Sequence, residues 1–138
     1  MRVFMLEDDQ RRVDYLANKV FGEEVTHTDS VSAAAEILRE NEFELIMLDH
    51  DLTRDSQMVV DDAVESGRDL AKLMSLEKLS VDTPIIVHSL NEEGANLICD
   101  ILEDTHSKVH RVDYFTLKFK YGLDGIQALL GDRKWESS

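Results

Sequence analysis

The chain has 138 residues, of which 43% are hydrophobic and 32% are charged, a composition that suits one globular domain with one core. It carries 15 Lys and Arg residues against 29 Asp and Glu residues, and a surface with a net charge of -14 repels duplex DNA and anionic membranes. The single cysteine, Cys99, excludes an internal disulfide, and because we find no signal peptide and no apolar run of about 18 residues we expect a cytoplasmic location.

The chain begins with a short apolar run at residues 2–6, which predicts a buried strand that ends in a cluster of acids. Apolar residues then recur at helical spacing, so a helix is expected, capped by Asp8 or Asp9 and ended by Gly22. Residues 24–28 predict a second, weaker strand. The amino-terminal part is therefore expected to form a strand, a helix and a strand in succession.

A second helix, capped by Ser30 or Ser32 and closed by Asn41, is expected to lead into the central strand of the chain. Four consecutive apolar residues at 45–48 are too few for a buried helix and typical of a strand that is covered on both faces of a parallel sheet. This strand ends abruptly in the sequence Asp-His-Asp. Open parallel sheets bind ligands beyond the carboxyl ends of their strands, so these polar residues occupy a place where chemistry is expected.

The second half of the chain repeats this pattern after a long interruption. Residues 53–66 show no sustained period and predict an inserted loop that can act as a lid. A helix is expected from Gly67, and Pro84 then opens a fourth strand at residues 85–89, where its missing amide donor does no harm. Asn91 is expected to begin the next helix.

The carboxyl-terminal part is predicted to hold a fifth strand at residues 109–114 and a final helix at residues 126–130. Between them, apolar residues and lysines alternate at 117–120, a pattern that indicates an extended segment. Residues 133–138 are expected to form a flexible tail. We therefore expect a single domain over residues 1–132.

The alternation of strands and helices predicts an α/β fold, a five-stranded parallel sheet with helices on both faces and the flavodoxin-like strand order 2-1-3-4-5. In that order the first and third strands are neighbours, and the fourth strand follows the third. Polar residues from these three strand ends are then expected to converge at one edge of the sheet. They are Glu7, Asp8, Asp49, Asp51, His88 and Ser89.

Carboxylates that gather in one crevice repel one another, and a hard divalent cation relieves this repulsion. We expect Mg²⁺, which binds one or two carboxylates and leaves positions open for a phosphate. Asp8 and Asp49 are the preferred direct ligands, with Glu7 bound through water and Asp51 as a further oxygen donor. The alternative is that each acid only caps the helix that follows it, which is common for one aspartate but explains three clusters poorly.

Two histidines border the expected metal. His88 is a candidate to donate a proton to a leaving oxygen or to bind a phosphate, and His50 lies between two acids. The alternative is that both are only polar residues at the rim of the sheet. Arg11 and Arg12 are either phosphate ligands or exposed helix residues, and Asn91 offers either an amide contact or a helix cap.

The chain resembles the receiver domain of response regulators along nearly its whole length. Glu7 and Asp8 look like the acidic pair of that family, Asp49 like its phosphoacceptor aspartate, and Ser89 like its Ser or Thr at the end of the fourth strand. Receivers usually place a Gly closer to the phosphoacceptor than Gly67 is, and they end the fifth strand in a Lys-Pro that this sequence lacks.

With these departures, the chain is similar to one branch of the family, the cyclic-phosphate-processing receiver-like domains. The similar motifs lie at residues 6–12, 48–52 and 87–95. The resemblance implies an enzyme that uses Mg²⁺ and a histidine to hydrolyse a cyclic phosphate on a nucleotide or an RNA end. Two alternatives stay open: a response-regulator receiver that is phosphorylated on Asp49, and a non-catalytic module that binds a phosphate ligand or a protein partner.

Overall fold

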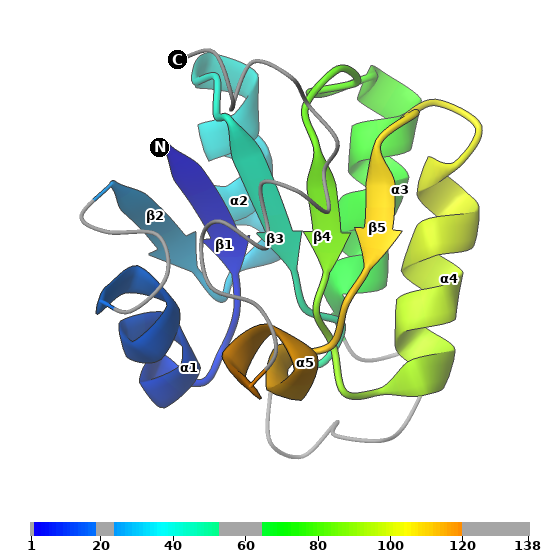
Figure 1. Cartoon of the computed structure of the whole chain (residues 1–138). Helices are drawn as coiled ribbons and strands as arrows, with labels where there is room; N and C mark the ends of the chain where they lie inside the picture. The colour runs from blue at the N-terminus through cyan, green and yellow to red at the C-terminus, as the bar shows by residue number, and fades with distance from the viewer. Residues whose placement is uncertain (1, 19–23, 53–64, 120–138) are drawn as a thin grey trace, which may run out of the picture.

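The structure, a computed structural model, describes residues 2–18, 24–52 and 65–119. Its strands are β1 (Val3–Leu6), β2 (Val25–Thr28), β3 (Leu45–Leu48), β4 (Ile85–Val87) and β5 (Val109–Arg111). They form one parallel sheet in the order β2-β1-β3-β4-β5, and all five arrows in Figure 1 run toward the same edge. The predicted fold class and strand order are therefore confirmed.

In the described ranges, four helices connect successive strands and a fifth follows β5, and together they cover both faces of the sheet, as the sequence predicts (Figure 1). They are α1 (Gln10–Leu16), α2 (Val31–Glu40), α3 (Gly67–Glu77), α4 (Glu92–Leu102) and α5 (Tyr114–Phe119). Three of the predicted caps are confirmed: the side chains of Asp9, Ser30 and Asn91 accept backbone hydrogen bonds at the starts of α1, α2 and α4. Each cap fixes where its helix leaves the preceding strand.

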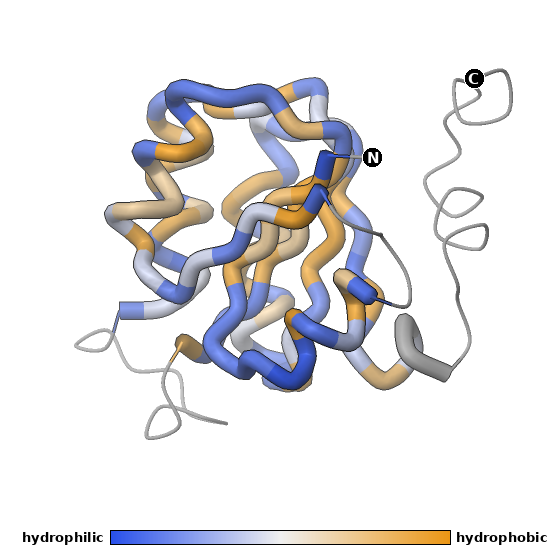
Figure 2. Tube along the Cα trace, turned by 90° about the vertical axis from the view of Figure 1, so that its left-hand side faces the viewer, coloured by the Kyte–Doolittle hydropathy of each residue, from blue (hydrophilic) through white to orange (hydrophobic). Residues whose placement is uncertain are grey.

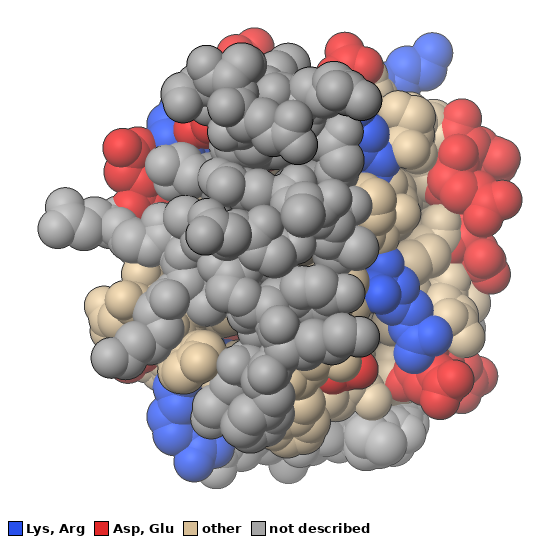
Figure 3. Space-filling model, viewed as in Figure 1, with Lys and Arg blue, Asp and Glu red and all other residues tan. Residues whose placement is uncertain are grey.

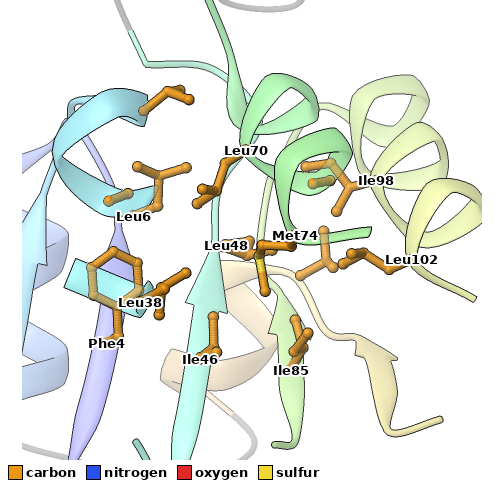
Figure 4. Packing of buried hydrophobic residues seen from close by; sticks show 14 of the residues in the cluster. Phe4, Leu6, Leu38, Ile46, Leu48, Leu70, Met74, Ile85, Ile98 and Leu102 are labelled. Carbon is orange, nitrogen blue, oxygen red and sulfur yellow. The ribbon is translucent and has the colours of Figure 1, made fainter. Parts of the chain in front are cut away.

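Alternating residues of the central strands divide the core into two layers. Phe4, Ile46 and Ile85 pack with α2, α3 and α4, and Figure 4 shows their side chains beside those of Leu38 and Met74. We call this side of the sheet the α2–α4 face. The strands form an apolar centre between more polar helices (Figure 2), which explains why their sequences read as unbroken apolar runs.

The opposite side of the sheet, which we call the α1/α5 face, packs against α1 and the start of α5. Its strand residues are Val3, Met5, Leu45, Met47 and Ile86. Val13 and Leu16 of α1 and Tyr114 of α5 cover them. This face is the one that the candidate site shares.

The prediction for residues 109–114 is wrong at its end, and the extended segment predicted over 117–120 is wrong for 117–119, the part of it that the structure describes. The strand β5 ends at Arg111, and helix α5 begins at Tyr114. Asp113 explains the change, because its carboxylate accepts hydrogen bonds from the amide (2.9 Å) and the hydroxyl (3.2 Å) of Thr116, as in a helix cap. This local cap prevails over the apolar alternation that suggested an extended chain.

Other predictions lie outside the described residues. These are the end of the first helix at Gly22, most of the inserted loop at 53–66, the helix at 126–130, the domain boundary at 132 and the tail at 133–138. Within the described part of the chain, no helix is long and apolar enough to cross a membrane.

Candidate acidic site at the strand ends

The three central strands end in register. Leu6 pairs with Leu48, and Leu48 pairs with Val87. The parallel ladder continues for one residue beyond each end, because the amide of Asp49 donates to Leu6 O (3.0 Å) and the amide of His88 donates to Leu48 O (2.9 Å). The residues that follow the three strands are therefore held side by side by backbone hydrogen bonds.

The same ladder decides which side chains meet. Side chains alternate between the two faces of a strand, and Met5, Met47 and Ile86 lie on the α1/α5 face. Residues two positions later, Glu7, Asp49 and His88, follow the same alternation. Each offers a ligand atom, and these three atoms lie within 4.8 Å of one another.

All three side chains are buried, with relative exposures of 0%, 2% and 0% for Glu7, Asp49 and His88. His88 Nε2 lies 3.0 Å from Glu7 Oε1, so the two side chains share one hydrogen bond. The other oxygen of Glu7 accepts from the amides of Asp8 (3.0 Å) and Asp9 (3.2 Å), and Asp49 Oδ1 accepts from the amide of His50 (2.8 Å). Backbone donors thus orient both carboxylates.

Burial favours the neutral forms of these groups. It raises the pKa of Glu7 from an ordinary 4.5 to about 7. It also raises the pKa of Asp49 from 3.8 to about 8, and the nearby charge of Glu7 adds to this effect. The pKa of His88 falls from 6.5 to about 4, again chiefly because of burial. A bound cation would therefore return Glu7 and Asp49 to their ionised, ligating form, whereas the neutral imidazole that burial favours in His88 needs no such change.

Helix α1 brings one positively charged side chain close to this cluster. Arg12 Nη1 lies 3.6 Å from Glu7 Oε1 and 3.9 Å from Asp49 Oδ2. Its guanidinium carbon lies 5.3 Å from the ring centre of Tyr114, which is buried at the start of α5. Arg11, which the sequence suggested as a phosphate ligand, is 85% exposed and binds Asp9 instead (Nη2 to Oδ2, 3.3 Å).

A second polar cluster lies one residue further along β3. His50 Nδ1 is 2.7 Å from Asp51 Oδ1, which also accepts a hydrogen bond from Asn91 Nδ2 (3.1 Å). Asn91 in turn caps α4 through the amide of Gly94 (3.0 Å). The carboxylate of Asp51 therefore fixes the orientation of the His50 ring, in the way that an aspartate orients a catalytic histidine.

Two glycines let helices approach this edge of the sheet. A Cβ atom on Gly67 would overlap the carbonyl oxygen of Asp49, and a Cβ atom on Gly94 would come within 2.6 Å of His50 Nδ1. The amide of Gly67 donates to the carbonyl of His50 (2.8 Å), which ties the start of α3 to the end of β3. Both positions therefore require glycine because of close packing against the site.

The buried histidines differ in how their ring nitrogens are satisfied. Both nitrogens of His106 have partners, the hydroxyl of Thr105 (2.8 Å) and the carbonyl of Leu79 (2.7 Å), so it is a structural histidine. His50 Nε2 and His88 Nδ1 are buried and have no hydrogen-bond partner among the residues that the structure describes. Unsatisfied buried nitrogens are rare and require an explanation. A ligand or cation at the strand ends is such an explanation.

The other predicted site residues lie around this core. Asp8 is partly exposed and is not one of the three residues whose ligand atoms cluster, so the structure places Glu7, not Asp8, beside Asp49. Ser89 is buried, and its hydroxyl accepts a hydrogen bond from the amide of Asn91 (3.1 Å). The roles assigned to these residues stay predictions.

From the sequence, both Arg11 and Arg12 are candidate phosphate ligands and Arg11 is the one preferred, while Tyr114 is expected only as the end of a strand. The position directly after each apolar run was the signal that could have separated Glu7 from Asp8. Side chains alternate along a strand, so the first residue after β1 and the first after β3, Glu7 and Asp49, face the same side when the two strands end in register. The sequence does not show that Arg12 is more buried than Arg11. It also does not show that a helix begins at Tyr114, which places that ring beside Arg12.

Comparison with known families gives one match. The profile of the family described as "Cyclic-phosphate processing Receiver domain" matches residues 1–104. No curated protein matches the sequence. The matched range contains Glu7, Arg12, Asp49 and His88.

Solved receiver domains share the fold at low sequence identity. The response regulator receiver domain from Methanospirillum hungatei is 15% identical, with a TM-score of 0.62 over 98% of this chain and 97% of that one. The receiver domain from Methylobacillus flagellatus is 10% identical, with a TM-score of 0.61 over 95% and 96% of the two chains. The response regulator TrrA from Thermotoga maritima, solved in complex with Mg(2+)-BeF, is 15% identical, with a TM-score of 0.58 over 93% and 97%.

Proposed function

The chain belongs to the family of cyclic-phosphate processing receiver domains, and on this premise we propose that its acidic pocket binds a divalent cation and hydrolyses a cyclic phosphodiester. The observation that carries the proposal is the buried cluster of Glu7, Asp49 and His88, whose ligand atoms lie within 4.8 Å of one another. Two carboxylates are buried here at a strand-end crevice, where parallel sheets bind their ligands.

The donor set fits a divalent cation. Two carboxylates supply the oxygen ligands that Mg²⁺ prefers, and the partly exposed Asp8 follows Glu7 directly. The same oxygen donors also suit Mn²⁺. A bound cation would polarise the phosphoryl oxygens and acidify a bound water.

The histidines supply the proton chemistry of the proposed reaction. Hydrolysis of a cyclic diester joins a water oxygen to phosphorus and breaks one bond from phosphorus to an ester oxygen. One proton leaves the water and one proton reaches the departing oxygen, so a single imidazole can accept the first and donate the second. His88 suits this role because it lies in the cluster, with its Nε2 3.0 Å from Glu7 Oε1 and its Nδ1 buried without a partner in the described ranges. His50, whose Nδ1 lies 2.7 Å from Asp51 Oδ1 and whose ring packs against Gly94 of α4, is the alternative carrier.

The experiment is a turnover assay with purified protein and Mg²⁺. The panel contains 2′,3′-cyclic nucleotides, 3′,5′-cyclic nucleotides and an RNA with a 2′,3′-cyclic phosphate end. We expect a monoester product from at least one of them, and we expect Asp49→Asn to lower its rate by about 100-fold or more because a cation ligand is lost. The exposed Asp100 on α4 gives a matched control, since Asp100→Asn removes the same charge away from the site.

The assay separates hydrolysis from simple binding. A ligand that raises the melting temperature only with Mg²⁺, and remains intact after hours, identifies a binding module. If no compound of the panel is hydrolysed or shifts the melting temperature, the proposal is wrong.

A second candidate is a phosphoacceptor switch. The ends of β3 and β4 hold Asp49 and the buried Ser89 on neighbouring strands, and the solved structures with this fold include response regulators. Incubation with a small phosphodonor and Mg²⁺ then adds one phosphoryl group, detected by mass spectrometry and lost in Asp49→Asn. Unmodified wild-type protein excludes this candidate.

A further inference from the structure

The guanidinium of Arg12 lies close to the acidic cluster but does not form a short hydrogen bond with it. Its distances to Glu7 Oε1 (3.6 Å) and Asp49 Oδ2 (3.9 Å) exceed the roughly 2.7–3.2 Å of such a bond. The distance from its Nε to Asp9 Oδ2 is also long (3.8 Å), and Asp9 already binds Arg11. Arg12 is therefore attracted electrostatically by three carboxylates, but it lies too far from each of them to form a short hydrogen bond.

The aromatic ring of Tyr114 supports the guanidinium of Arg12. The aromatic ring lies 5.3 Å from the guanidinium carbon, within the range of a cation–π contact. The ring is held in turn by an edge contact with Tyr15 (6.4 Å between centroids). The amide of Tyr114 donates to the carbonyl of His88 (3.0 Å), so the support of Arg12 is tied to the strand end that carries His88.

This arrangement presents a cation at a defined position in an otherwise negative pocket. A guanidinium offers donors in a planar fork that matches the oxygens of a phosphate, and stacking on an aromatic ring leaves this fork available. At 21%, the exposure of the Arg12 side chain is low enough to orient it and high enough for a ligand to reach it. Among the described residues, no side chain of β5 brings a positive charge to the three clustered side chains.

We propose that Arg12, supported by the ring of Tyr114, is the residue that binds the phosphate group of the ligand beside the cation site. The inference rests on the proposed function and adds to it the group that recognises the anion. It also replaces Arg11 with Arg12 as the expected phosphate contact.

The proposal makes opposite predictions for the cation and for the anion. Arg12 repels a cation at Glu7 and Asp49, so Arg12→Gln is expected to leave Mg²⁺ affinity unchanged or to raise it a few-fold. The same change removes the donors that meet the phosphate, so affinity for inorganic phosphate in saturating Mg²⁺ falls roughly 10- to 100-fold. A purely structural role for Arg12 would weaken both affinities together.

The experiment measures Mg²⁺ alone, and then inorganic phosphate in saturating Mg²⁺, by isothermal titration calorimetry. Arg12→Lys keeps the charge but not the fork, so an intermediate loss of phosphate affinity is expected. Arg11→Gln tests the competing arginine one position away. Arg39→Gln is the control for a lost positive charge, because Arg39 pairs with Glu77 between α2 and α3.

The outcomes separate this inference from the proposed function. Wild-type protein that takes up no Mg²⁺ contradicts both. Wild-type protein that binds Mg²⁺ and phosphate, with the phosphate affinity unchanged in Arg12→Gln or reduced only in Arg11→Gln, overturns the inference and leaves the cation site in place. Loss of both affinities in Arg12→Gln also overturns it, since Arg12 would then only maintain the fold of the pocket.

Discussion

At the scale of single residues, Glu7 and Asp49 determine the behaviour of the pocket. Both carboxyls are buried, and their pKa values are raised to about 7 and about 8. An acid whose pKa is higher in the folded than in the unfolded chain holds its proton more tightly when folded. As the pH rises between the two values, the folded state loses stability relative to the unfolded state.

This shift predicts the pH dependence of stability without metal. In EDTA, the melting temperature is expected to fall as the pH rises from 6.5 to 8. His88 does not oppose this fall, because lowering its pKa from 6.5 to about 4 affects stability mainly between those two values. At pH 8, Asp49→Asn removes one of the two buried charges, so it is expected to raise the free energy of unfolding by about 2 kcal/mol or more. Thermal and urea unfolding at both pH values measure these effects.

In saturating Mg²⁺, we expect the wild type to become more stable as the pH rises, and Asp49→Asn to be less stable than the wild type at pH 8. A bound cation stabilises the ionised carboxylates of the wild type and not the amide of the variant. Asp100→Asn, on the exposed side of α4, is the control for a change in net charge. A wild-type stability in EDTA that rises from pH 6.5 to 8 would contradict the assigned environment of Glu7 and Asp49.

At the scale of elements, the starts of α3 and α4 hold the residues around the acidic cluster in place. Gly94 at the start of α4 packs against the ring of His50, and Gly67 at the start of α3 packs against the carbonyl of Asp49. These contacts link the positions of α3 and α4 to the end of β3. The same two helices also pack against each other and against the sheet around Leu70, Met74 and Ile98 (Figure 4).

Gly94→Ala tests this coupling. The added methyl group requires the His50 ring to move, so we expect a destabilisation of about 2 kcal/mol and a loss of turnover on any cyclic phosphate that the wild type hydrolyses. Glu93→Ala, at an exposed neighbouring position, is the control. Unfolding by urea and the rate at saturating substrate are the measurements. An alanine variant with wild-type stability and wild-type rate would show that the His50 position does not depend on this contact.

Much of the element order follows from local signals in the sequence. Apolar runs predicted β1, β3 and β4, the strands β2 and β5 were predicted from weaker patterns, and Asp9, Ser30 and Asn91 are caps that the sequence identifies. The error after Arg111 arose because lysines and apolar residues alternate at 117–120, while the cap at Asp113 begins a helix. A single capping side chain is a weaker signal in a sequence than an alternation, although it decides the local structure.

The sequence predicts which strand ends form the site, but it does not predict which side chains meet there. Strand order brings the ends of β1, β3 and β4 together, so the acidic crevice followed from topology. Which of Glu7 and Asp8 lies beside Asp49 depends on the side of the sheet that each residue faces. Which of Arg11 and Arg12 reaches the crevice depends on how α1 packs, and that information is tertiary.

At the scale of the whole molecule, the negative surface limits the class of ligand. The net charge is -14, and acidic side chains line the edge where α4 lies in the view of Figure 3. Such a surface repels an extended polyanion, so a ligand with one or two phosphates is expected rather than a long nucleic acid. A cation and Arg12 would then supply the local positive charge that the surface lacks.

The most direct test of this account is calorimetric titration with Mg²⁺ and Mn²⁺ at pH 8 of the wild type, Glu7→Gln and Asp49→Asn. We predict one site in the wild type, uptake that releases protons because both carboxyls must ionise, and at least about 10-fold weaker binding in each variant. Wild-type protein that takes up neither ion, or variants that bind as tightly as the wild type, would contradict the claim that this pocket is a cation site.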